Sequence, residues 1–127
     1  MKRIAIVTGA SSGMGREFVL QLSNWEKFEE IWVIARRTER LEELAKEVPV
    51  PVRPISLDLT DPDALHYYQD LLEAAAPNVG LLANIAGFGK FGRYDQIPLA
   101  DSLKMIDLNC KALVAITELT LPYMRRG

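Results

Sequence analysis

The stretch Ile4–Gly15 reads IAIVTGASSGMG, and it decides the fold. Its first four residues, Ile4–Val7, are all apolar, which predicts a strand buried on both faces, as in a parallel sheet. Gly9, Gly13 and Gly15 then allow the chain to turn tightly and to begin a helix near Gly13. The N-terminus of such a helix carries free N–H groups and a partial positive charge, and glycine leaves room for a pyrophosphate. The stretch therefore predicts a strand–turn–helix unit that binds a nucleotide, rather than an ordinary turn.

Two serines lie inside this turn. The hydroxyls of Ser11 and Ser12 can donate further hydrogen bonds to a phosphate. The Gly-Lys-Ser/Thr ending of phosphate-loop nucleotide triphosphatases does not follow. The glycines therefore indicate a nucleotide site of another class.

Three further segments of the chain have the character of strands. Ile31–Ala35 and Val79–Ile85 are apolar runs, the second broken only by Gly80 and Asn84, and both predict buried parallel strands. Val50–Leu57 interleaves apolar residues with prolines, which predicts an edge strand because proline cannot donate to ladders on both sides. Helical patterns separate these segments, at Met14–Leu22, Leu41–Val48, Thr60–Ala75 and Leu99–Tyr123.

The alternation of strands and helices is typical of a doubly wound α/β fold. Right-handed crossovers with one reversal of winding direction predict a Rossmann-like parallel sheet with strand order 3-2-1-4. That order places Val50–Leu57 at an edge, as its own prolines predict. No linker or internal repeat divides the chain, so we expect residues 1–127 to form one nucleotide-binding domain.

The composition narrows the class of protein. Of the 127 residues, 49% are hydrophobic and 25% are charged, as in ordinary soluble globular proteins. A net charge of -2 and a pI near 5.4 give no electrostatic reason to expect nucleic acid or an anionic membrane as a partner. No window holds about 18 uninterrupted apolar residues, so no transmembrane helix is expected. We expect a cytoplasmic protein.

The chain has a single cysteine and a single histidine. They provide neither an internal disulfide nor a Cys/His metal set, so we expect no metal site. Cys110 lies on the same side of the last predicted helix as Ile106 and Leu113, and is expected to be a buried thiol. His66 is expected to be a surface imidazole.

Several motifs together resemble one family. Thr8–Gly15, with the pattern Thr-Gly-x-x-x-Gly-x-Gly, resembles the cofactor signature of the short-chain dehydrogenase/reductase family. Asp58 and Leu59 lie where the family places an Asp against the adenine ring. Asn84–Gly87 resembles the Asn-Asn-Ala-Gly motif beside the cofactor, and departs from it at Ile85. The glycine turn and the resemblance together assign the following residues to cofactor binding: Gly9, Ser11, Ser12, Gly13, Met14, Gly15, Asp58, Leu59, Asn84, Ala86 and Gly87.

The end of the second predicted strand bears on the choice of cofactor. An NAD site carries an acidic residue there for the ribose 2′-hydroxyl, whereas this chain has Ala35-Arg36-Arg37. A guanidinium suits the additional phosphate of NADP through forked, charge-assisted hydrogen bonds. Arg36 and Arg37 therefore predict NADP rather than NAD. The alternative is that both arginines are solvated at the start of the next helix.

The catalytic residues of the family are matched only in part. Asn109 lies where the family has its catalytic Asn. The family also carries a catalytic Ser and a Tyr-x-x-x-Lys pair, in which the Lys lowers the pKa of a tyrosine that acts as general acid and base. None of the four tyrosines here has a lysine four residues later, and the chain ends at Gly127, where the fifth strand of the family would begin.

Two interpretations follow. In the first, the chain is the cofactor half of an NADP-dependent oxidoreductase, inactive alone, whose longer parent moves hydride between NADPH and a carbonyl or alcohol substrate. In the second, it is a complete, non-catalytic nucleotide-binding or interaction module. Val79–Ile85 favours the first, because this apolar edge has none of the charge or proline that protects natural sheet edges. We also expect homo-oligomers, formed through this edge or through the exposed side of the last helix.

Overall fold

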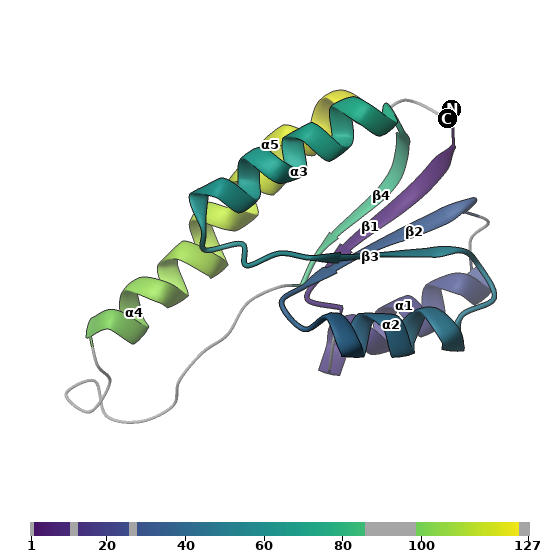
Figure 1. Ribbon diagram of the computed structural model, residues 1–127, viewed down its shortest axis with the longest axis horizontal. Helices are drawn as coiled ribbons and strands as arrows, with labels where there is room; N and C mark the ends of the chain where they lie inside the picture. The colour runs from purple at the N-terminus through teal and green to yellow at the C-terminus, as the bar shows by residue number, and fades with distance from the viewer. Residues whose placement is uncertain (1, 11–12, 26–27, 86–98, 125–127) are drawn as a thin grey trace.

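The computed structural model describes residues 2–10, 13–25, 28–85 and 99–124. Four parallel strands form one sheet in the order β3-β2-β1-β4 (Figure 1). The predicted Rossmann-like sheet with strand order 3-2-1-4 is thereby confirmed. The strands are β1 (Arg3–Thr8), β2 (Glu30–Ala35), β3 (Val52–Ser56) and β4 (Asn78–Asn84). The α-helices are α1 (Gly13–Trp25), α2 (Thr38–Glu47), α3 (Pro62–Ala75), α4 (Leu99–Ile106) and α5 (Leu113–Thr120).

Alternate residues of the sheet face two separate hydrophobic cores. On β1, Ile4 and Ile6 pack with residues of α3 and α5, whereas Ala5 and Val7 pack with residues of α1 and α2. Figure 1 shows these two pairs of helices on opposite faces of the sheet. The side chains of these four residues are all buried, because successive strand residues point to opposite faces and both faces are covered.

β3 is the edge strand next to β2. The two strands pair in parallel from Ile31 opposite Val52 to Ala35 opposite Ser56. Of the five residues of β3, only Ile55 is buried. Proline is tolerated here because an edge strand leaves one row of backbone groups without a ladder partner.

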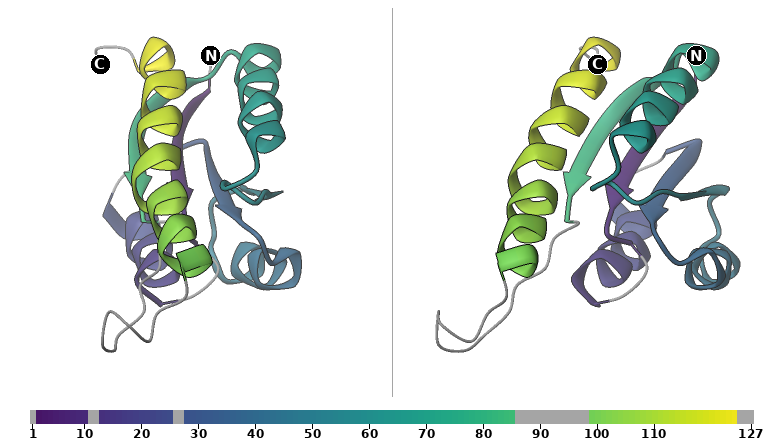
Figure 2. Two further views of the ribbon diagram at one scale, coloured as in Figure 1. Left: turned by 90° about the vertical axis from the view of Figure 1, so that its left-hand side faces the viewer. Right: turned by 60° about the vertical axis from the view of Figure 1, so that its left-hand side comes forward.

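The long C-terminal helix contains a π-helical turn. α4 continues into the π-helical segment Asp107–Ala112 (η2), then into α5 and a 3₁₀ turn at Leu121–Tyr123 (η3). The sequence predicts a helix over the same residues but not this turn, which has wider i→i+5 hydrogen bonding and is frequent at functional sites. Figure 2 shows the helix running alongside β4.

The covered side of this helix differs from the expected one. Ala112, Ile116 and Thr120 are buried, whereas Ile106 is 52% exposed. Cys110 is exposed as well, so the expectation of a buried thiol is wrong. The residues spaced by four occupy the side that faces the sheet and α3, and Cys110, two positions before Ala112, therefore points elsewhere.

Candidate cofactor site

Most of the predicted site residues that the structure describes lie at the carboxyl edge of the sheet. Thr8, at the end of β1, lies opposite Ile34 of β2 and Asn84 of β4, and Ala35 lies opposite Ser56 of β3. The carboxyl ends of all four strands therefore meet at one edge. From β1 the sheet extends to β2 on one side and to β4 on the other. Ligands of open parallel α/β sheets bind at such a reversal of winding.

The turn after β1 depends on two glycines with left-handed backbone conformations. Gly9 has a φ of 69°, and its N–H donates to the carbonyl of Ile34 at 2.8 Å. Gly13, the first residue of α1, has a φ of 59°. Residues with a Cβ rarely adopt such angles, so the spacing of glycines in the sequence corresponds to a real backbone requirement.

Gly15 serves a different purpose, because it lets α1 pack directly on the turn. A Cβ at Gly15 would lie 1.9 Å from the carbonyl oxygen of Gly9. A Cβ at Gly13, in contrast, meets no described atom within 4 Å, and the neighbouring Met14 is 76% exposed. The backbone at the start of α1 is therefore accessible, because Gly13 has no side chain to cover it. Such a backbone fits a phosphate at the helix N-terminus.

Arg36 and Arg37 form the whole connection between β2 and α2, here called the arginine connector, and both are exposed. The hydroxyl of Ser56 donates to the carbonyl of Arg36 at 3.0 Å, and the N–H of Leu41 donates to that of Arg37 at 3.3 Å. Within the described part of the chain, neither guanidinium pairs with a carboxylate. The connector thus presents two positive charges beside the carboxyl edge.

Asp58 and Leu59 follow β3, and they differ in environment. The Oδ1 atom of Asp58 accepts hydrogen bonds from the N–H and the hydroxyl of Thr60, at 3.0 Å and 2.6 Å. Leu59 is buried in the core beneath α3. The carboxylate of Asp58 is therefore held in one orientation, whereas the side chain of Leu59 is directed to the core rather than to a ligand.

Two threonine hydroxyls hold the end of β4. The amide of Asn84 donates to the hydroxyl of Thr117 on α5 at 3.0 Å, and that hydroxyl donates to the carbonyl of Leu113 at 2.7 Å. The buried hydroxyl of Thr8 accepts from the N–H of Ile85 at 3.0 Å. Sequence reasoning assigned neither threonine. Thr8 opens the Thr-Gly motif and could have been found there, but no local pattern links Thr117 to Asn84.

Five predicted residues receive no structural account of their side chains. Ser11, Ser12, Ala86 and Gly87 lie outside the described residues. Asn109 lies in η2, and its side chain also lies outside the described part. The roles assigned to all five stay predictions.

Tyr68 is a buried tyrosine, but it lacks the properties of a general acid. Its hydroxyl lies 2.6 Å from that of Thr120 in the core between α3 and α5. Burial raises its pKa to about 12, against the lowering effect of the hydrogen bond with Thr120. A catalytic tyrosine needs a pKa closer to the working pH. Tyr68 therefore acts as a packing residue.

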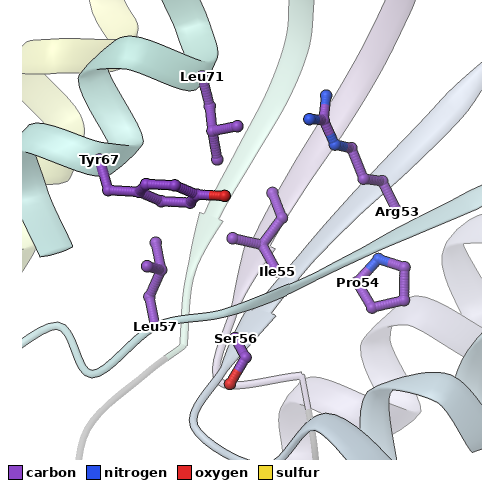
Figure 3. A pocket seen from close by; sticks show the side chains of 7 residues that line it. All are labelled: Arg53, Pro54, Ile55, Ser56, Leu57, Tyr67 and Leu71. Carbon is purple, nitrogen blue, oxygen red and sulfur yellow. The ribbon is translucent and has the colours of Figure 1, made fainter.

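A surface pocket of about 460 Å³ lies between β3 and α3. In Figure 3, Tyr67 and Leu71 of α3 face Ile55 and Leu57 across it. The remaining lining residues are Arg53, Pro54 and Ser56. None of the predicted cofactor residues lines this pocket, so it is separate from the candidate site.

The described residues form neither a metal-binding cluster nor a membrane-spanning helix. No three His, Cys, Asp or Glu side chains there group closely enough to hold a metal ion. No helix in the same residues is long and apolar enough to cross a membrane.

Comparison with known proteins places the chain in a family. The family model described as short chain dehydrogenase matches residues 3–127, so the chain belongs to the short-chain dehydrogenase/reductase family of oxidoreductases. It is 37% identical over 129 residues to sulfoacetaldehyde reductase 2 of Chromohalobacter salexigens. The aligned region covers 98% of this chain and 50% of that protein. The chain spans about half the length of the curated relatives that it matches.

Solved structures agree with this membership. A short-chain dehydrogenase from Sphingobium yanoikuyae in complex with NADPH superposes with a TM-score of 0.81 at 28% identity, covering 94% of this chain and 48% of that one. A metagenomic short-chain oxidoreductase in complex with NADP gives a TM-score of 0.85 at 26% identity, covering 95% and 56%.

Proposed function

We propose that residues 1–127 form the NADP-binding domain of a short-chain dehydrogenase/reductase, and that they are the N-terminal part of a longer protein. The observation that carries this proposal is the exposed arginine connector, free of carboxylate partners among the described residues, at the same sheet edge as the glycine turn. The N-terminus of α1 suits a pyrophosphate, and the two guanidinium groups suit the 2′-phosphate that distinguishes NADP from NAD. The NADPH and NADP complexes of two structural neighbours support this choice.

The reaction of the longer protein is the transfer of hydride between NADPH and a carbonyl or alcohol substrate. When bound, the reduced nicotinamide gives hydride to a carbonyl and the oxidised nicotinamide takes hydride from an alcohol, and the residues of this chain bind and orient the cofactor. We assign Gly9, Gly13 and Gly15 to the pyrophosphate and Asp58 to the adenine side. Asn109 takes the role of the catalytic Asn by its resemblance to the family.

The chain alone binds the cofactor but does not reduce carbonyl compounds, because none of its tyrosines has a lysine four residues later. Binding without turnover by a stable monomer would instead favour a stand-alone nucleotide-binding module. We further propose that the protein is cytoplasmic and forms homo-oligomers. The exposed apolar side chains of Leu103, Ile106 and Leu113 on the C-terminal helix support self-association.

The substitution Arg36→Asp tests the choice of cofactor. We expect the affinity of the purified chain for NADPH to fall roughly 10- to 150-fold, the equivalent of one charge-assisted contact, with a much smaller change for NADH. Calorimetric titration with each cofactor measures both affinities.

The matched control is Lys46→Asp, which makes the same change of charge at the other end of α2. We expect it to leave the ratio of the two affinities unchanged. Equal losses of NADPH and NADH binding in Arg36→Asp would contradict the assignment, as would an unmodified chain that binds neither cofactor.

A further inference from the structure

The arginine connector is held at both of its carbonyl groups. The carbonyl of Arg37 accepts from the N–H of Leu41, which is the ordinary first hydrogen bond of a helix. The carbonyl of Arg36 lies beyond the last residue of β2, and it accepts from the hydroxyl of Ser56 at 3.0 Å. The side chain of Ser56 therefore attaches the connector to β3 one residue beyond the end of β2.

Ser56 is placed for this contact by the geometry of β3. It is the last residue of the strand and lies opposite Ala35. The next residue, Leu57, donates its N–H to the carbonyl of Ala35 at 3.0 Å. Ile55 packs into the core on the α3 face, so the side chain of Ser56 points to the opposite face, where the chain leads into α2.

We propose that Ser56 is a positioning residue that sets the preference of this chain for NADPH over NADH. The inference rests on the proposed NADP-binding function and extends it to a residue outside the cofactor motifs. The hydrogen bond fixes the peptide between Arg36 and Arg37, and with it the directions in which both guanidinium groups leave the backbone. Forked bonds to a 2′-phosphate depend on these directions, whereas NADH has no phosphate at that position.

Two substitutions of equal shape isolate the hydroxyl. Ser56→Thr keeps it and Ser56→Val removes it, while both add the same bulk to an exposed position in a strand that favours β-branched residues. We expect Ser56→Thr to keep the ratio of NADPH to NADH affinity. We expect Ser56→Val to lower NADPH affinity about fivefold, as for one neutral hydrogen bond, and to change NADH affinity by less than about twofold.

Calorimetric titration of the whole chain and of both variants with NADPH and with NADH measures the affinities, and thermal unfolding shows whether each variant is folded. If Ser56→Val does not fold, Ser56→Ala takes its place, with the same expected loss. Equal ratios in the Thr and Val variants, or equal losses of both cofactors, overturn the positioning role. An unmodified chain without preference for NADPH overturns the proposed function instead, and the inference with it.

Discussion

Gly13 and Gly15 belong to one motif, but the structure requires glycine at them for different reasons. At Gly13 the backbone has a left-handed conformation and an added Cβ meets no described atom within 4 Å. At Gly15 the added Cβ would lie 1.9 Å from the carbonyl oxygen of Gly9. The first position concerns access to the start of α1, and the second concerns the packing of α1 on the turn.

This difference predicts that a substitution at Gly15 mainly lowers stability, whereas a substitution at Gly13 mainly weakens cofactor binding. Gly15→Ala should lower the free energy of unfolding by about 3 kcal/mol, because backbone atoms of the turn have to move. Gly13→Ala should cost only about 1 kcal/mol for the strained φ, but its methyl group stands in the proposed phosphate site and weakens NADPH binding. Urea unfolding and calorimetric titration measure the two effects. NADPH binding at full strength in Gly13→Ala would rule out a phosphate at this position.

At the scale of elements, α3 and α5 are joined by a buried pair of hydroxyls. The hydroxyls of Tyr68 and Thr120 lie 2.6 Å apart, and that of Thr120 also donates to the carbonyl of Ile116 at 2.6 Å. Burial raises the pKa of Tyr68 to about 12, because the charged phenolate is poorly solvated between the helices.

The raised pKa predicts a loss of stability in alkali. Between about pH 10 and pH 12 the unfolded chain loses the proton of this tyrosine while the folded chain keeps it, so stability falls as pH rises. The contribution of Tyr68 is complete below about pH 10 and falls by about 2–3 kcal/mol towards pH 12. Urea unfolding of the chain and of Tyr68→Phe across this range measures it, since other titrating groups are common to both. Parallel pH profiles would contradict the effect.

The C-terminal helix shows where local patterns stop being informative. Its length follows from the sequence, because helical apolar spacing extends from Leu99 to Tyr123. The same spacing places Ile106, Cys110 and Leu113 on one side, but it does not show whether another element covers that side. The sheet and α3 cover the side of Ile116 instead. The π-helical turn at Asp107–Ala112 was likewise not predicted from the residues that form it.

At the scale of the whole molecule, the sheet has two unlike edges. Both β3 and β4 are edge strands of the described sheet, but β3 carries a proline and an arginine, whereas β4 carries neither a proline nor a charged residue. The helix beside it exposes about half of the surface of Leu103 and of Ile106, at 51% and 52%. An apolar strand edge next to an apolar helix side is a surface suited to association.

This surface predicts self-association of the chain. Light scattering at micromolar concentration should give a mass above that of the 14.2 kDa monomer. The double substitution Ile106→Lys and Leu113→Lys should lower that mass, because it places charge on the apolar side of the helix. Tyr67→Lys, at an exposed position on α3, is the control and should leave the mass unchanged. A monomer from the unmodified chain would contradict the prediction.

Local sequence was sufficient for much of this molecule. Continuous apolar runs specify strands covered on both faces, prolines specify the edge position of β3, and glycine spacing specifies the turn at the start of α1. These features follow from steric and solvation preferences of neighbouring residues, so they can be read without the fold.

Other features arise only when distant segments meet. The hydroxyl of Ser56 reaches the carbonyl of Arg36 across 20 positions of sequence, and the hydroxyl of Thr117 holds Asn84 across 33. The exposure of Cys110 likewise depends on which side of its helix the sheet covers. Such contacts depend on single polar groups and on the packing of whole elements. Neither produces a periodic pattern in the sequence, because the folded arrangement determines which residues become partners.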